Sequence, residues 1–134
     1  FENVTLPQEF IDWVKQPHTC YYDEIKLLDN ITISAMVHIT GGGVIDNPPR
    51  VLSDDKCMNI YKENLITSEF KYIQQQGNVT NEEMYRTLNC GIGFMIVLDD
   101  ENYRKAADIF DLINIEYCKC GYISTRSDKQ VNFI

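Results

Sequence analysis

Apolar residues follow two patterns along this chain, and the patterns alternate. Spacings of three and four residues place apolar side chains on one helix face and predict helices over 7–15, 19–29, 67–76, 80–89 and 100–113. Continuous apolar or β-branched runs predict strands over 33–40, 57–61, 92–98, 115–124 and 130–133. The continuous run 92–98 is the best candidate for a central strand. The alternation predicts the α+β class, as a layered α/β domain around a mixed sheet.

Capping and terminating residues stand at several of the predicted helix ends. Asp99 can cap the helix that follows it, and Gly77 is suited to end one. Thr80, with Glu83 three residues later, forms the capping-box pattern of a helix start. Glu83 and Arg86 are also spaced for an ion pair on the surface of that helix.

The chain has the length and composition of one domain. Its 134 residues, of which 44% are hydrophobic, can bury an ordinary core, and no linker or internal repeat divides them. The net charge of −8 argues against nucleic acid, whose binding needs clustered Lys and Arg, but not against one anionic small molecule. No apolar run approaches the roughly 20 residues of a membrane span. We therefore expect neither nucleic acid nor membrane as a partner.

The cysteines indicate a reducing environment. There are five, an odd number without the spacing of a disulfide framework. Reduced thiols favour a cytoplasmic location. Cys118 and Cys120 would face the same side of a strand, too far apart to bridge easily. No spacing of His, Cys, Asp and Glu makes a metal cage, so no metal ligand is predicted.

A glycine triplet follows the first predicted strand. Gly41, Gly42 and Gly43 could turn their N–H groups toward an anion, with a hydroxyl donor from Thr40 and a guanidinium fork from Arg50. A flexible turn that merely permits positive φ explains the same residues. The segment lacks both the Lys-Ser/Thr pair of a nucleoside-triphosphate loop and the spacing of the dinucleotide fingerprint.

The second candidate site is the turn that precedes the strand 92–98. Asn89, Cys90 and Gly91 stand there between two rigid elements, where polar groups can contact a ligand. The alternatives are that Asn89 caps the preceding helix and that Cys90 is a small buried residue. His38 likewise is either a general base or a satisfied structural histidine.

Five sequence blocks follow one another in a specific order: His38-Ile39-Thr40-Gly41-Gly42-Gly43, Asn47-Pro48-Pro49-Arg50-Val51-Leu52, Gly77-Asn78-Val79, Glu83-Met84-Tyr85-Arg86-Thr87 and Asn89-Cys90-Gly91-Ile92-Gly93. In this order and spacing they resemble the aminoimidazole ribonucleotide synthetase family, also called phosphoribosylformylglycinamidine cyclo-ligase. The resemblance covers about 17–134, which it implies is the C-terminal domain of the cyclo-ligase. Residues 1–16 match nothing and are predicted to be a divergent lead-in or interdomain segment. Where the family usually has Pro-Thr-Arg, this chain has Pro17-His18-Thr19.

The resemblance implies a reaction and a part in it for this chain. The family uses ATP and magnesium to close formylglycinamidine ribonucleotide into aminoimidazole ribonucleotide in de novo purine biosynthesis. Both are bound mainly by an N-terminal domain that pairs into a homodimer and that nothing here matches. The resemblance therefore implies that this chain needs no cofactor of its own and is inactive without that domain.

By the same resemblance, His38 is the catalytic candidate. The residues implied to bind the substrate are Thr40, Gly41, Gly42, Gly43, Arg50, Asn89, Cys90 and Gly91. For Arg50, an anion contact and a structural ion pair stay equally open. Two other functions also stay open: a non-catalytic module of the same superfamily that binds a phosphorylated ligand or assembles with a partner, and the amidotransfer enzyme one step earlier in the pathway.

Overall fold

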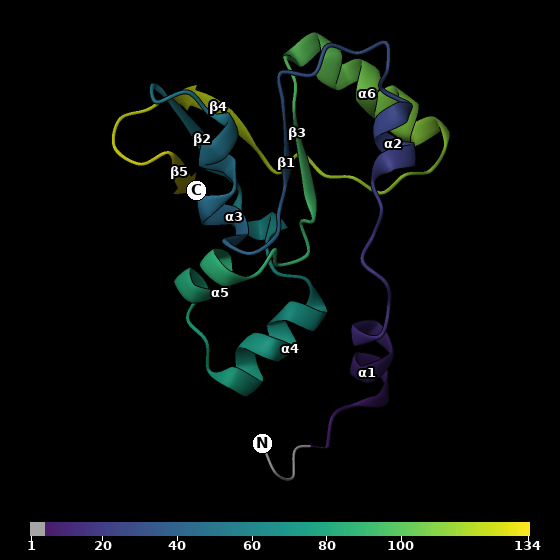
Figure 1. Cartoon of the computed structure of the whole chain (residues 1–134), viewed down its shortest axis with the longest axis vertical. Coiled ribbons are helices and arrows are strands. Elements are labelled where there is room, and N and C mark those ends of the chain that lie inside the picture. The colour runs from purple at the N-terminus through teal and green to yellow at the C-terminus, as the bar shows by residue number, and fades with distance from the viewer. Residues whose placement is uncertain (1–4) are drawn as a thin grey trace.

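A computed structural model describes residues 5–134, and Figure 1 shows how their elements are arranged. Of the predicted lead-in, residues 1–4 lie outside the described residues. The helices are α1 (Gln8–Val14), α2 (Tyr22–Lys26), α3 (Gly43–Asp46), α4 (Ser68–Gly77), α5 (Asn81–Thr87) and α6 (Asp100–Leu112), with short 3-10 helices η1 (Pro48–Val51) and η2 (Lys62–Asn64). The strands are β1 (Ala35–His38), β2 (Lys56–Ile60), β3 (Phe94–Val97), β4 (Gly121–Thr125) and β5 (Val131–Phe133). Within this part of the chain, no helix has the length and apolar character needed to cross a bilayer.

The described strands form two sheets. β1 and β3 make an antiparallel pair in which His38 lies opposite Phe94. β2 is the middle strand of the other sheet, antiparallel to β4 and parallel to β5, so this sheet is mixed. The predicted α+β class with a mixed sheet is confirmed. The prediction that 92–98 is a central strand is wrong, because among residues 5–134 its strand, β3, pairs with β1 alone.

β2 is central although a polar residue interrupts its apolar pattern. Asn59 is 6% exposed. Its carboxamide donates to the Ser124 hydroxyl on β4 over 2.8 Å and accepts from the Asn132 carboxamide on β5 over 3.4 Å. A buried polar group is tolerated when it is hydrogen-bonded. Asn59 therefore links all three strands, a role that hydropathy alone does not reveal.

The strand predicted over 115–124 forms only in its second half, as β4. Asn114 has a left-handed φ of 57° and follows the end of α6, and the Ile115 N–H donates back to the Phe110 carbonyl over 2.9 Å. Tyr117 then packs on the Phe110 ring with 5.5 Å between centroids. The apolar residues of this segment therefore pack against α6 instead of pairing in a sheet.

Two hydrophobic clusters hold the fold together. The larger joins β1, α3, β2 and α5 through buried side chains that include Ile39, Val44, Ile60 and Met84. The smaller consists of Leu28, Ala106 and Phe110 and holds α6 against the segment after α2. The long β1–β3 pair runs from the α3 and α5 region to the α6 and α2 region in Figure 1. Each large apolar side chain buried in this way contributes about 1.5–3 kcal/mol.

The helix ends confirm two predicted caps and correct one terminator. The Thr80 hydroxyl accepts from the Glu83 N–H over 3.3 Å, and the Asp99 carboxylate accepts from an N–H in the first turn of α6 over 2.7 Å. Gly77, predicted to terminate the helix, is still helical, and Asn78 takes the left-handed cap position with φ 49°. Asparagine tolerates this conformation because its short polar side chain can hydrogen-bond locally.

α1 lies against α4 through aromatic rings. Phe10 packs on Tyr72 with centroids 4.8 Å apart, and Trp13 meets Phe70 edge-on at 5.3 Å. Offset and edge-on contacts of this kind add about 0.5–1.5 kcal/mol beyond the area that they bury. The N-terminal helix therefore packs on the wall that carries Phe70, a residue of the cavity described next.

Candidate functional site

The glycine triplet forms a turn that is held from within by Asn47. The Asn47 side chain is 3% exposed, and its Nδ2 donates to the carbonyl oxygens of Gly43, Gly41 and Thr40 over 2.7, 3.3 and 3.4 Å. Pro48 directly follows and begins η1, where its fixed φ and missing N–H suit the first position. One amide group therefore gathers three carbonyl groups of the turn between β1 and α3.

The direction of these carbonyls sets the direction of the N–H donors. In a planar trans peptide the C=O and the next N–H point opposite ways. The N–H groups of Gly41 and Gly42 therefore turn away from Asn47, to which the preceding carbonyls point. The Gly43 N–H instead donates to the Thr40 carbonyl over 3.0 Å. The turn thus offers two backbone donors to a ligand, where the triplet suggested three.

The three glycines meet different needs. Gly41 is exposed, and a Cβ there would have no neighbour within 4 Å. Gly42 has φ 98°, a value that L side chains rarely adopt. Gly43 is buried, and a Cβ there would collide with the Tyr85 carbonyl oxygen and lie 2.7 Å from that of Leu88. Gly43 therefore allows α3 to approach α5 closely.

Arg50 lies over the same turn. Its guanidinium is 3.7 Å from the position that a Cβ on Gly42 would take. Arg50 is exposed, and none of the ion pairs formed within residues 5–134 includes it. Its positive charge therefore lies close to Gly42 in the glycine turn.

The turn between α5 and β3 is closed by its own asparagine. Asn89 Oδ1 accepts the N–H of Gly91 over 3.1 Å. Cys90 and Gly91 take left-handed φ values of 56° and 102°. α5 ends earlier, at Thr87, and the extended Leu88 is its cap residue. Asn89 therefore closes the turn and is not the helix cap.

Cys90 is a buried thiol. Its side chain is completely buried and donates to the Met84 carbonyl over 3.4 Å. Burial raises the pKa of the Cys90 thiol to about 11, because a low-dielectric environment disfavours the thiolate. Since the thiolate is the nucleophilic form, the structure favours a small buried residue over a nucleophile.

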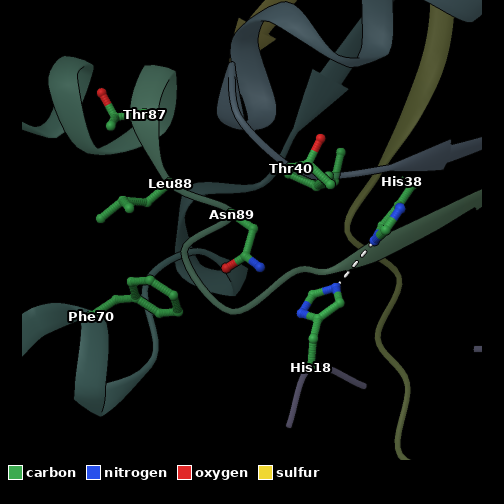
Figure 2. Close-up of a pocket in the computed structure, with 8 residues that line it drawn as sticks. His18, His38, Thr40, Phe70, Thr87, Leu88 and Asn89 are labelled. Carbon is green, nitrogen blue, oxygen red and sulfur yellow. Dashed lines mark hydrogen bonds between the residues drawn. The ribbon is translucent and has the colours of Figure 1, made fainter. Parts of the chain in front are cut away.

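The two turns meet at one cavity of about 400 Å³ (Figure 2). Its lining consists of His18, His38, Ile39, Thr40, Phe70, Thr87, Leu88 and Asn89. Three of the predicted site residues, His38, Thr40 and Asn89, are thereby brought together. The other six lie outside the lining: Gly41, Gly42, Gly43, Arg50, Cys90 and Gly91.

Several lining residues were not predicted from the sequence. Phe70 and Leu88 form apolar wall, and their helical spacing marks them only as core positions. Thr87 belongs to one of the recognised blocks, and its hydroxyl donates to the Glu83 carboxylate over 3.0 Å. His18 stands in the segment that departs from the family's pattern, and this departure is the signal that could have found it.

The predicted ion pair between Glu83 and Arg86 is not formed in the described part of the chain. Arg86 instead contacts Asp46 on α3 at 3.4 Å and Glu82 on its own helix at 3.5 Å. The first contact joins α5 to α3 beside the glycine turn. Because both of its side chains are about half exposed, it contributes at most about 1 kcal/mol.

Histidine provides the ionisable groups of the cavity. Among the described residues that line it, none is Asp, Glu, Lys or Arg. His18 and His38 are both exposed, and their Nε2 atoms lie 3.1 Å apart. No group of three or more His, Cys, Asp or Glu side chains within 5–134 is placed to hold a metal ion.

The comparison with protein families decides where the chain belongs. The family model described as "AIR synthase related protein, C-terminal domain" matches residues 3–133. The chain belongs to this family. The match runs through α1, through the glycine turn and through the Asn89 turn. Every wall of the cavity in this AIR synthase related domain therefore comes from the matched region.

Relatives of this AIR synthase related domain carry one name, phosphoribosylformylglycinamidine cyclo-ligase. The protein of Finegoldia magna is 37% identical over 123 residues, which cover 90% of this chain and 35% of the relative. The protein of Staphylococcus carnosus is 32% identical over 133 residues, 98% of this chain and 38% of the relative. The protein of Methylobacillus flagellatus is 40% identical over 99 residues, 72% of this chain and 29% of the relative. The chain spans about a third of the length of these curated relatives.

Proposed function

We propose that this chain is the C-terminal part of an ATP-dependent cyclo-ligase. The proposed reaction closes formylglycinamidine ribonucleotide into aminoimidazole ribonucleotide, with release of ADP and phosphate, in purine biosynthesis. Support comes from the family match over residues 3–133 and from the shared name of the relatives. The observation that carries the proposal is that three recognised blocks, one at the end of β1, one in α5 and one preceding β3, contribute to the same cavity.

The proposed reaction depends more on the positioning of the reactants than on covalent catalysis by the protein. Transfer of the terminal phosphoryl group of ATP to the formyl oxygen makes that oxygen a good leaving group. A substrate nitrogen then forms a bond to the formyl carbon, loses its proton, and the C–O bond breaks as phosphate departs. Oriented donors and a held substrate supply most of such a rate enhancement. ATP with magnesium supplies the phosphoryl group and neutralises its charge, and we assign both to the N-terminal part of a longer protein.

The residues of this chain take three roles in the proposal. The outward N–H groups of Gly41 and Gly42 and the charge of Arg50 bind a phosphate group at the glycine turn. Thr40 and Asn89 orient the substrate from the cavity wall. His38 accepts the proton that the attacking nitrogen loses. Histidine suits this step because its ordinary pKa lies near neutrality.

The proposal also covers the state of the protein. We place the active enzyme in the cytoplasm, as a homodimer through its N-terminal part. The 134-residue chain by itself needs no cofactor and turns over no ATP in this proposal. The relatives, of which the chain covers 29–38%, support a partner domain of this kind.

The deciding experiment is turnover by the protein extended upstream to its natural start. ATP, magnesium and formylglycinamidine ribonucleotide are supplied, and aminoimidazole ribonucleotide is measured together with phosphate. Equal amounts of both products are expected, with none from the 134-residue chain alone. A folded, ATP-binding longer protein that makes no aminoimidazole ribonucleotide would refute the assignment.

Site variants connect that turnover to the cavity. Thr40→Val keeps the size of the side chain and removes the hydroxyl, so it should reduce kcat/KM about tenfold or more, the loss of roughly one good hydrogen bond. Thr32→Val changes an exposed threonine outside the lining and is the matched control. Equal turnover by the two variants would remove Thr40 from the proposed site.

A further inference from the structure

Two histidines from distant segments meet at the edge of the cavity. His18 precedes α2, and His38 ends β1. Their Nε2 atoms are 3.1 Å apart, and Figure 2 marks this contact with a dashed line. A hydrogen bond of this kind requires an N–H on one ring and a free lone pair on the other.

Aromatic rings lie beside both imidazoles. Tyr21 lies 6.3 Å from the His18 ring and 6.2 Å from the His38 ring, centroid to centroid. Phe94, opposite His38 in the β1–β3 pair, lies 6.0 Å from it and 5.3 Å from Tyr21. A Cβ on Gly93 would collide with the Tyr21 hydroxyl, so the phenol packs directly on β3. The pair is therefore seated in a cluster of four rings.

The described lining of the cavity beside the pair holds no carboxylate, ammonium or guanidinium group. Ile39 and Thr40 line the cavity between β1 and the glycine turn. Leu88 and Asn89 line it from the turn before β3. α4 and α5 contribute Phe70 and Thr87. Among the described lining residues, titratable groups other than the two imidazoles are therefore absent, and the phenol of Tyr21 is the titratable group packed against them.

We propose that His18 is a positioning residue that holds His38 through this imidazole–imidazole hydrogen bond, so that the two rings accept one proton as a unit. In the neutral pair, one ring carries its proton on Nε2 and the other on Nδ1. In the singly protonated pair, the imidazolium donates to the neutral ring. In the doubly protonated pair both Nε2 atoms carry protons, so the bond breaks and the two charges repel.

The pair has a direct consequence for the exposed His38 side chain. Without a partner, an exposed imidazole samples several rotamers and both neutral tautomers. With His18 bound to its Nε2, the ring is held in one orientation, and the protonation of its Nδ1 is coupled to the tautomer of His18. A role of the held His38 ring in proton transfer rests on the proposed function. The hydrogen bond between His18 and His38 does not depend on that function. Position 18 belongs to the segment Pro17-His18-Thr19, where the chain departs from the family's Pro-Thr-Arg.

The test is nitrogen NMR of the 134-residue chain with ¹⁵N-labelled histidine. Above the pH at which the pair takes up its proton, a scalar coupling between the two Nε2 nuclei is expected, together with one Nε2–H ring and one Nδ1–H ring. Acidification until both rings are protonated should abolish the coupling. Two neutral rings that both show the Nε2–H tautomer would leave no acceptor and overturn the proposal. Absence of the coupling at every pH would overturn it as well.

Variants separate positioning from simple structural support. His18→Leu should leave the Nε2 of His38 without a partner, whereas His18→Gln places an amide near the lost Nε2 and should restore a hydrogen-bonded His38 ring. Because His18 is exposed, both variants should keep the backbone spectrum and melting temperature of the parent. A His38 signal that is the same in the parent and in His18→Leu would refute a positioning role. These readings need no turnover, so they stand or fall independently of the cyclo-ligase assay.

Discussion

Replacing Asn47, which does not itself line the cavity, by leucine should loosen the glycine turn. Asn47 is 3% exposed, and its Nδ2 serves the carbonyls of Gly43, Gly41 and Thr40. Leucine is similar in size and has no donor. The Gly43 carbonyl, which has the shortest of the three bonds at 2.7 Å and is buried, would lose the amide that it now binds.

The size of the loss depends on whether each of the three carbonyl groups finds another hydrogen-bond donor. An unsatisfied buried acceptor costs about 1–3 kcal/mol, and this applies to Gly43. The Thr40 carbonyl keeps the N–H of Gly43, and the carbonyl of the exposed Gly41 can bind water, so each of these bonds adds no more than about 1 kcal/mol. The sum is a loss of about 1–5 kcal/mol in the free energy of unfolding. For a domain of this size each kcal/mol lowers the melting temperature by about 4 °C, so the melting temperature falls by roughly 4–20 °C.

Urea unfolding, followed by far-ultraviolet circular dichroism, measures this loss. Asn30→Leu changes an exposed asparagine and is the matched control, expected within about 0.5 kcal/mol of the parent. Asn47→Asp at neutral pH places a negative charge against three carbonyl oxygens and should destabilise at least as much as Asn47→Leu. If Asn47→Leu were as stable as Asn30→Leu, the amide would not be what holds the turn.

Two further predictions concern packing and ionisation. Gly43→Ala should destabilise the chain strongly and Gly41→Ala hardly at all, because only at Gly43 does a new Cβ meet backbone; thermal unfolding compares the two. The pKa of the Cys90 thiol rises from 9.0 to about 11 on burial, so its stabilisation is complete below pH 9 and is lost as pH rises toward 11. Urea unfolding from pH 8 to 11 should show a larger loss in the parent than in Cys90→Ala, which keeps other groups of raised pKa such as the Cys120 thiol. A thiol reagent at pH 8 should label the exposed Cys20 readily and Cys90 only after unfolding.

The features that local sequence decides were predictable. The hydroxyl of Thr80 and the carboxylate of Asp99 accept N–H groups within three residues of themselves, so the starts of α5 and α6 depend on nothing distant. The order of helices and strands also follows from local periodicity. Strand pairing does not, because it depends on residues far apart in the chain. The central place of β2 rests on Asn59, whose partners Ser124 and Asn132 lie 65 and 73 residues away.

The sequence predicted individual residues of the candidate site, but it did not predict that they meet in one cavity. His38, Thr40 and Asn89 were recognised from two separate blocks, and their meeting depends on the pairing of β1 with β3. In an antiparallel pair the end of one strand lies beside the beginning of the other. With His38 opposite Phe94, the residues after β1 lie beside the residues before β3. Once this register is known, the shared cavity follows.

The role of Asn47 shows the limit of motif recognition. The Asn47-Pro48-Pro49-Arg50 block pointed to Arg50 as the contact residue, because a guanidinium has an evident use beside a phosphate. Asn47 acts through three backbone carbonyls whose positions exist only in the folded turn. No pattern in the sequence indicates that one side-chain amide binds these three carbonyls. The role of Asn47 is therefore visible only in the folded structure.

The arrangement of donors restricts what a ligand of this domain must look like. The proposed function uses Arg50 and the outward N–H groups of Gly41 and Gly42 for a phosphate. It uses the contact between His18 and His38 for the proton. Thr40 joins the cavity to the glycine turn by sequence and by its contact with Asn47. Under the proposed function, a ligand that uses both sides carries an anionic group at one end and a group that exchanges a proton at the other.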